Sequence, residues 1–134
     1  MTGLDDDIAR AIDAGLNRAL GFSLDEASGD RVVLSWTVAE QHLQPYGIVH
    51  GGVYCSAVES SASIGGALWF GERGRVVGVS NQTDFLRSAT EGRLTAVATP
   101  IHRGRSQQLW LVEITGADGR LNARGQVRLQ NLTG

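Results

Sequence analysis

The sequence predicts an α+β fold in which an antiparallel sheet wraps around one long central helix. Residues 50–69 form a run of small and apolar residues that is long enough for a helix of several turns. Most of residues 31–38 and 75–129 alternate apolar with polar side chains, which is the pattern of half-buried strands. A long helix followed by a series of strands is typical of the α+β class. The small residues of the helix would let the sheet approach it closely.

A helix and one or two strands are expected before the long helix. Apolar residues recur every four positions from residue 4 to residue 20, which predicts one amphipathic helix over 4–20, closed by Gly21. The acidic run at 5–7 suits the N-terminus of that helix. A strand is expected at 31–38, and a loop at 39–49 then leads into the long helix. The apolar positions that define the buried face of this strand are Val32, Leu34, Trp36 and Val38.

Four strands are expected after the long helix. They cover residues 75–85, 94–101, 108–115 and 121–129. Alternation in the first of them predicts that Val77, Val79 and Phe85 share one side of the sheet. The tetrapeptide at 116–119, Gly-Ala-Asp-Gly, predicts a hairpin turn between the last two strands.

Composition and charge exclude several classes of function. The chain has 134 residues, of which 42% are hydrophobic and 19% charged, so one globular domain over residues 1–134 is expected. A net charge of −2 gives no support for a nucleic-acid partner. All 12 basic residues are arginine, which excludes a lysine Schiff base or a P-loop lysine. His42, His50 and His102 lack the spacing of zinc ligands, and no nucleotide-binding fingerprint is present, so neither a metal nor a cofactor is expected.

The sequence also bears on cellular location. The acidic N-terminus lacks the basic region of a secretory signal. Serines, glycines and Glu59 interrupt the apolar run at 50–70, which argues against a membrane span. A cytoplasmic protein with no membrane partner is therefore expected.

Residues that could carry chemistry gather on the long helix. Glu59 is the one charged side chain among residues 51–71, and a carboxylate on a buried helix is costly unless it has a use or a partner. It could act as a base or a nucleophile, and Ser63, four residues on, would share its helix face. The alternative, a structural glutamate that a hydroxyl or an arginine satisfies, stays open at this stage.

The start of the long helix is a second candidate. His50-Gly51-Gly52 places unpaired backbone N–H groups where they could bind a developing negative charge, although the triplet could also be only a flexible turn. Gly51 and Glu59 are eight residues apart, about 12 Å along a helix that rises about 1.5 Å per residue. One small carbonyl cannot easily touch both groups of the same helix. We therefore predict a dimer whose active sites are shared between two chains.

Two clusters of arginine and serine are expected at strand ends. They are Arg87-Ser88 and Arg103-Gly104-Arg105-Ser106. Guanidinium groups beside hydroxyls suit phosphates, although any single arginine could simply be solvated. Beside an acyl site, two such clusters point to a phosphorylated carrier.

One longer motif resembles a known family. The run Gln44-Pro45-Tyr46-Gly47-Ile48-Val49-His50-Gly51-Gly52, followed by Glu59-Ser60 and Ser63, resembles the hotdog-fold acyl-CoA thioesterases. Within them it is most similar to the branch of the Arthrobacter-type 4-hydroxybenzoyl-CoA thioesterase and the dihydroxynaphthoyl-CoA hydrolase. The resemblance implies a hotdog fold, dimers that pair into homotetramers, and hydrolysis of an acyl-CoA or acyl-carrier thioester with an aromatic or bulky acyl group. Phe85 stands where branch members carry a histidine.

The resemblance also implies roles for individual residues. Glu59 matches the catalytic carboxylate, as nucleophile or base, and the Gly51 N–H matches the oxyanion donor. Gln44 matches the residue that aligns the carbonyl, His50 the histidine near the thioester, and Ser63 the hydroxyl that positions water or the acyl-enzyme. The residues that match contacts to the nucleotide end of coenzyme A are Arg87, Ser88, Arg103, Arg105 and Ser106.

Two other functions remain as alternatives. A hotdog dehydratase or hydratase would need His50 and Glu59 to converge on one substrate carbon, and the Gln44-Pro45 lead-in favours hydrolysis instead. A non-catalytic acyl-CoA-binding module is disfavoured by the presence of Glu59, Gln44 and Ser63, because a decayed site has no evident need for them.

Overall fold

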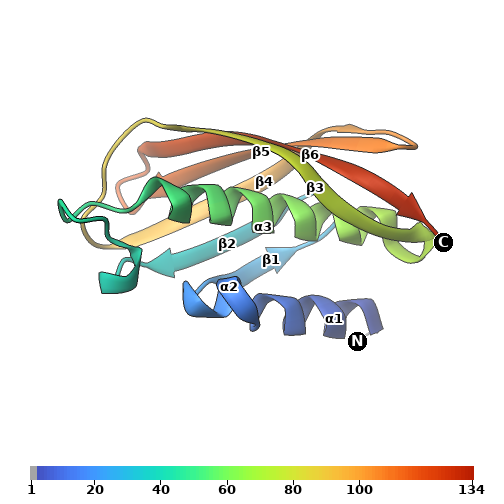
Figure 1. The fold of residues 1–134 in the computed structure, drawn as a ribbon, viewed down its shortest axis with the longest axis horizontal. Helices are drawn as coiled ribbons and strands as arrows, with labels where there is room; N and C mark the ends of the chain where they lie inside the picture. Colours follow the sequence, from blue (N-terminus) through green and yellow to red (C-terminus); the bar gives the residue numbers. More distant parts are fainter. Residues whose placement is uncertain (1–2) are drawn as a thin grey trace.

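The computed structural model describes residues 3–134 and contains one antiparallel sheet around a long helix (Figure 1). The helices are α1 (Gly3–Ile12), α2 (Gly15–Ala19) and α3 (Gly51–Phe70), with short 3-10 turns at Glu40–His42 and Gly71–Arg73. The strands are β1 (Ser23–Ala27), β2 (Val32–Thr37), β3 (Gly74–Phe85), β4 (Arg93–Arg103), β5 (Gln107–Gly116) and β6 (Leu121–Thr133). The six strands lie in the order β1-β2-β4-β5-β6-β3, and each neighbouring pair is antiparallel. The predicted α+β fold is confirmed.

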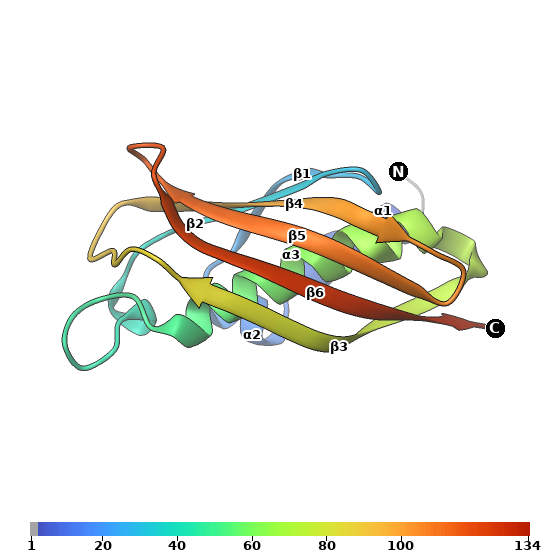
Figure 2. The ribbon, with the colours of Figure 1, turned by 90° about the horizontal axis from the view of Figure 1, so that it is seen from above.

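Helix α3 lies in the hollow of the curved sheet, as the two perpendicular views show (Figures 1 and 2). Its small residues allow this close packing. A Cβ atom at Gly65 would lie 2.6 Å from the ring of Trp110, so only glycine leaves room for that ring. Trp110, Val112 and Ile114 of β5 are fully buried, because every second residue of the strand faces the helix.

The N-terminal region differs from the single helix that was expected. Helix α1 ends at Ile12, and α2 begins at Gly15, whose φ of 52° is a left-handed conformation that favours glycine. Because the chain turns there, Ile12 packs against the core whereas Leu16 is 61% exposed. The expectation of one continuous helix over 4–20 is therefore wrong. Strand β1 is the second strand that the predicted order allowed before the long helix, for which no bounds were predicted. The side chains of residues 4 and 5, which belonged to the predicted pattern, lie outside the described residues.

Strand β3 contains a β-bulge that the sequence pattern does not reveal. Its register against β6 shifts between Gly78 and Ser80, so Val79 is an extra residue on β3. An extra residue reverses which of the following side chains face the helix. Val77 is exposed on the outer side, whereas the Phe85 ring packs against the start of α3. The expectation that Val77, Val79 and Phe85 share one side is wrong for this reason.

Strand β3 forms one edge of the sheet (Figure 2). Within residues 3–134 it pairs only with β6, so the backbone groups along its other edge have no strand partner. None of the described helices is both long and apolar enough to cross a membrane.

Candidate active site

The first turn of α3 presents one backbone donor to the surface. His50 is the N-cap, and its Nδ1 atom accepts a hydrogen bond of 2.8 Å from the Gly52 N–H. The His50 N–H in turn donates to the His42 carbonyl at 2.8 Å, which fixes the entry into the helix. Among the hydrogen bonds of residues 3–134, none uses the Gly51 N–H. This N–H at the positive end of the helix dipole can therefore bind an oxygen that becomes negative.

A groove of about 340 Å³ lies beside this N–H. It is lined by Gln44, Ile48, Val49, Gly51, Tyr54, Phe85, Leu86, Arg87 and Ser88. The Oε1 atom of Gln44 accepts a hydrogen bond from the Tyr46 N–H, which turns the amide so that its NH₂ group is the end left to bind a ligand. The structure thus brings Gln44, Gly51 and the Arg87-Ser88 pair into one groove.

Glu59 lies halfway along α3 and is exposed in the single chain, so the expectation of a buried carboxylate is wrong. The Asn81 Nδ2 atom of β3 lies 3.4 Å from Glu59 Oε1 and donates to it. Ser63, one turn further on, lines a groove of about 330 Å³ with Glu59.

A second groove at Glu59, of about 530 Å³, includes residues that the sequence analysis did not select. It is lined by Leu16, Asn17, Cys55, Ser56, Glu59, Ser60 and Asn81. The Ser60 hydroxyl donates to Asn17 Oδ1 at 2.6 Å, and this hydrogen bond connects α2 to the middle of α3. No local feature of the sequence marks Asn17 as a site residue. Asn81 faces α3 only because of the β-bulge, and the alternation of the sequence does not reveal that bulge.

The predicted catalytic residues form two separate groups within one chain. Gln44, His50 and Gly51 lie at the start of α3, whereas Glu59 and Ser63 lie further along it, and no residue lines both the Gly51 groove and a Glu59 groove. The separation of the two groups along α3 agrees with the spacing of Gly51 and Glu59 in the sequence.

The two arginine clusters are also far apart. Arg87 lies near the beginning of β4 and donates to Asp118 at 2.6 Å. This hydrogen bond, with a second from the Arg120 backbone N–H, lowers the pKa of the Asp118 carboxyl. Arg103 ends β4, ten residues after Arg93 and roughly 30 Å away for a strand that rises about 3.3 Å per residue. One subunit therefore does not bring the two clusters to the same phosphate.

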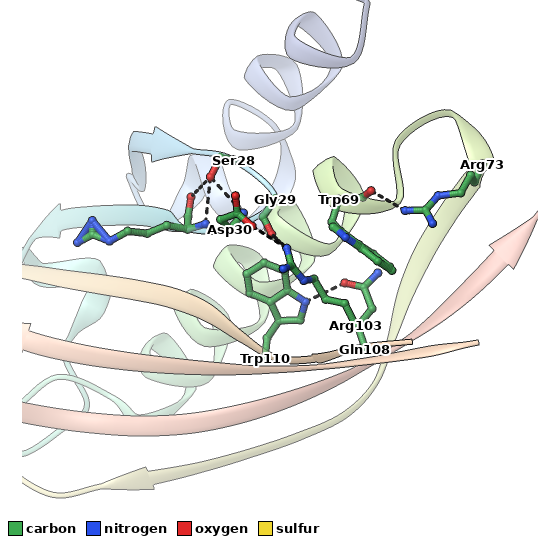
Figure 3. Close-up of polar contacts among 9 residues, drawn as sticks. Ser28, Gly29, Asp30, Trp69, Arg73, Arg103, Gln108 and Trp110 are labelled. Atoms are coloured by element: carbon green, nitrogen blue, oxygen red, sulfur yellow. Dashed lines mark hydrogen bonds and ion pairs between the residues drawn. The ribbon is translucent and has the colours of Figure 1, made fainter. Parts of the chain in front are cut away.

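Arg103 is occupied by contacts within the fold (Figure 3). Its Nη1 atom donates to the Gly29 carbonyl at 2.7 Å and to Asp30 at 2.8 Å, and its guanidinium lies 5.6 Å from the centre of the Trp69 ring. Arg73 covers the same ring at 4.4 Å. By contrast, Arg105 and Ser106 are exposed in the turn between β4 and β5.

Tyr54 forms a buried wall of the Gly51 groove. Its side chain is 2% exposed, and neither its hydroxyl nor the facing Asn122 Oδ1 atom makes a hydrogen bond among the described residues. Burial raises the pKa of the Tyr54 phenol, and the nearby Asn122 side chain opposes part of that rise. No group of three or more His, Cys, Asp and Glu side chains in the described part of the chain is arranged to hold a metal ion.

A six-stranded antiparallel sheet wrapped around a long helix, with an open helix N-terminus at a groove, defines the protein as one of the hotdog-fold class. Residues 46–123 match the family profile of the thioesterase superfamily, and the chain belongs to that superfamily. It is a thioester hydrolase, in keeping with its relatives.

Three relatives show the range of similarity. The crystal structure of AziG from S. sahachiroi is 52% identical, has a TM-score of 0.88, and matches 90% of this chain and 98% of that one. The 1,4-dihydroxy-2-naphthoyl-CoA hydrolase of Escherichia coli strain K12 is 33% identical over 102 residues, which are 76% of this chain and 75% of that protein. The thioesterase SAV0944 of Staphylococcus aureus is 28% identical, with a TM-score of 0.82, over 86% of this chain and 96% of that structure.

Proposed function

We propose that the protein hydrolyses an acyl-CoA whose acyl group is aromatic or similarly bulky, releasing the free acid and coenzyme A. The observation that carries this proposal is the groove in which the unpaired Gly51 N–H, the Gln44 amide and Arg87 lie together. The 33% identity to a naphthoyl-CoA hydrolase supports the choice of an aromatic acyl group.

The groove suits the charge changes of thioester hydrolysis. Attack on the thioester carbon places negative charge on the carbonyl oxygen. The Gly51 N–H would bind that oxygen, and the free NH₂ group of Gln44 would align it. His50, beside Gly51, would assist departure of the thiolate, and Arg87 and Ser88 would bind phosphate at the outer end of the groove.

Glu59 would supply the attack. Its carboxylate either adds to the thioester carbon to form a mixed anhydride or removes a proton from an attacking water. In both routes the Ser63 hydroxyl, in the same groove, positions the water that completes hydrolysis. Two structures of SAV0944 carry alanine in place of a glutamine and of a glutamate fifteen positions apart, and Gln44 and Glu59 have the same separation.

The complete site would form between two copies of the chain. Strand β3 has a free edge, and Val77 and Val79 beside it are exposed. If two β3 strands pair antiparallel about a two-fold axis, the start of one strand lies opposite the end of the other. Glu59 lies beside Gly78 and Asn81 of its own β3, whereas Gly51 packs against Phe85 at the end of that strand. A two-fold axis between Asn81 and Phe85 would therefore carry each Glu59 toward the partner's Gly51 groove. Pairing of two such dimers would give a tetramer, in which Arg105 and Ser106 of another subunit could reach the same coenzyme A.

Release of free thiol from a panel of aromatic and aliphatic acyl-CoAs tests the reaction. Glu59→Ala and Glu59→Gln should lose about 10²-fold to 10⁴-fold in kcat, the range for removal of a catalytic base. Glu72→Ala, which removes another exposed glutamate just beyond α3, is the matched control and should keep wild-type turnover. Comparable turnover in Glu59→Ala and wild type would contradict the proposal.

Mixing two inactive variants tests the shared site. Homodimers of Gln44→Ala and of Glu59→Ala each lack one group in both sites. In a mixed dimer, one site carries both changes and the other carries neither, so mixing should restore about a quarter of wild-type activity. No recovery after subunit exchange, shown by mass spectrometry to be complete, would place Gln44 and Glu59 of one site in the same chain.

A further inference from the structure

The Glu59 carboxylate is held against β3 at two points. On one side is Gly78, where a Cβ atom would lie 3.1 Å from Glu59 Oε2, so the carboxylate occupies the space above this glycine. On the other side Asn81 Nδ2 lies 3.4 Å from Glu59 Oε1. The two contacts come from residues three apart on the same strand.

The β-bulge makes this arrangement possible. In a regular strand, residues three apart face opposite sides of the sheet. The extra residue, Val79, reverses the alternation, so Gly78 before the bulge and Asn81 after it both face α3. Bulges of this kind commonly re-aim a side chain beside an active site. Because of the bulge, Gly78, which has no side chain, lies on one side of the Glu59 carboxylate, and the Asn81 donor lies on the other side.

The orientation of the Asn81 amide is also determined by its neighbours. The Thr83 hydroxyl donates to Asn81 Oδ1 at 2.7 Å, so the oxygen end of the amide faces Thr83. The NH₂ end therefore faces α3, where it donates to the Cys55 carbonyl at 3.0 Å and to Glu59. Thr83 itself packs close to Gly125 of β6 and is partly buried.

We propose that Asn81, oriented by Thr83, is the positioning residue that holds the Glu59 carboxylate for attack on the thioester. The inference rests on the proposed catalytic role of Glu59 and extends it to the residues that aim the carboxylate. One of the two Asn81 NH₂ hydrogens is anchored on α3 through Cys55, which leaves the other for Glu59. At 3.4 Å the hydrogen bond from Asn81 to Glu59 is long, and catalytic hydrogen bonds commonly shorten when substrate binds.

Steady-state kinetics of position 81 variants test the proposal. Asn81→Ala removes the donor, and Asn81→Asp keeps the shape and the Thr83 contact but replaces the donor with a second carboxylate. Both should lower kcat about 10²-fold, the effect expected of a misaimed reacting group, and Asn81→Asp should be the slower because like charges repel. KM should change less than about twofold, because the residue does not bind the nucleotide end of the substrate.

Gln82→Ala is the matched control, since Gln82 is the next residue on the same strand and is exposed on its other side. It should keep wild-type kcat and KM. A purely structural role for Asn81 would lower the thermal midpoint and leave kcat per folded enzyme unchanged, and that result would overturn the proposal.

A double-mutant cycle isolates the role of Thr83. Thr83→Val keeps the side-chain volume but loses the hydroxyl, and it should lower kcat about threefold to tenfold, the kinetic equivalent of one neutral hydrogen bond. In the Asn81→Ala background the same change should have no effect, because Thr83 acts through Asn81. Additive effects would contradict this coupling.

The outcomes also separate this inference from the function on which it rests. If Glu59→Ala retains turnover, the proposed role of Glu59 fails. If Glu59→Ala is inactive but Asn81→Ala and Asn81→Asp keep wild-type kcat, Glu59 is catalytic and the positioning role of Asn81 is wrong.

Discussion

The ring of Phe85 covers Gly51 so closely that a side chain at position 51 would displace the ring. A Cβ atom on Gly51 would lie 2.5 Å from Phe85 Cζ. The same ring lies 6.0 Å from the Tyr54 ring, measured between centroids. Phe85 therefore forms one wall of the groove beside the Gly51 N–H, and its ring must move before position 51 can carry a side chain.

Gly51→Ala should destabilise the fold and reduce thiol release. The added methyl group must displace the Phe85 ring, and overpacking of this kind costs about 1–3 kcal/mol of the free energy of unfolding. Urea unfolding measures the loss. Phe85→Ala in the same chain should recover most of it, because the obstacle is gone. If Gly51→Ala alone is as stable as wild type, the ring moves freely and the close packing is not required.

Gly78→Ala should reduce turnover without unfolding the protein. Its Cβ atom would lie 3.1 Å from Glu59 Oε2 and 3.3 Å from Glu59 Cδ, so the carboxylate must shift by a few tenths of an ångström. A misplaced reacting group lowers kcat, here by about tenfold, whereas stability should stay within about 0.5 kcal/mol. Ser80→Ala, on the exposed stretch of the same strand, is the control for any general effect on β3. Unchanged kcat in Gly78→Ala would show that Glu59 needs no fixed position.

The sequence pattern predicts the parts of this fold that burial determines. Strand β5 is one example, because Trp110, Val112 and Ile114 can all be buried only if the strand faces a central helix. Helix α3 is another, because its run of small residues suits only a helix that is packed closely on one side. In both elements local pattern and tertiary packing agree.

Backbone irregularities account for the parts that the pattern does not predict. The left-handed Gly15 interrupts a regular apolar repeat, and nothing in the repeat itself marks the break. The bulge at Val79 likewise changes the facing of Asn81 and Phe85 without changing the alternation of the sequence. Glu59 is exposed on α3, beside the edge strand β3. Which strand forms the edge depends on strand order, and residue patterns do not predict strand order.

Arg103→Ala should cost more stability than Arg105→Ala, although both were predicted to bind coenzyme A. Arg103 donates to the Gly29 carbonyl and lies over Trp69, so its loss should lower the free energy of unfolding by about 1–2 kcal/mol. Arg105 is exposed, and its replacement should stay within about 0.5 kcal/mol. Thermal unfolding of the two variants measures the difference. Equal midpoints would show that the Arg103 contacts contribute nothing to the fold.

Tyr54→Phe should flatten the loss of stability at alkaline pH. Because burial raises the pKa of the Tyr54 phenol in the folded state, the folded protein keeps a proton that the unfolded chain releases above its ordinary pKa of about 10. The folded state is therefore favoured fully below that pH and loses stability as the pH rises through the folded pKa. A phenylalanine has no such proton, so the variant should decline less steeply from about pH 9 to pH 11.

Urea midpoints measured across this pH range test the effect of Tyr54. Tyr46→Phe is the matched control because its ring is 93% exposed, and its curve should follow that of the wild type. Tyr54→Phe also removes a buried hydroxyl that makes no hydrogen bond among the described residues, so this variant should be no less stable than wild type near neutral pH. Parallel curves for wild type and Tyr54→Phe would mean that the Tyr54 phenol ionises as easily in the folded protein as in the unfolded chain, and that the wall of the Gly51 groove is open to water.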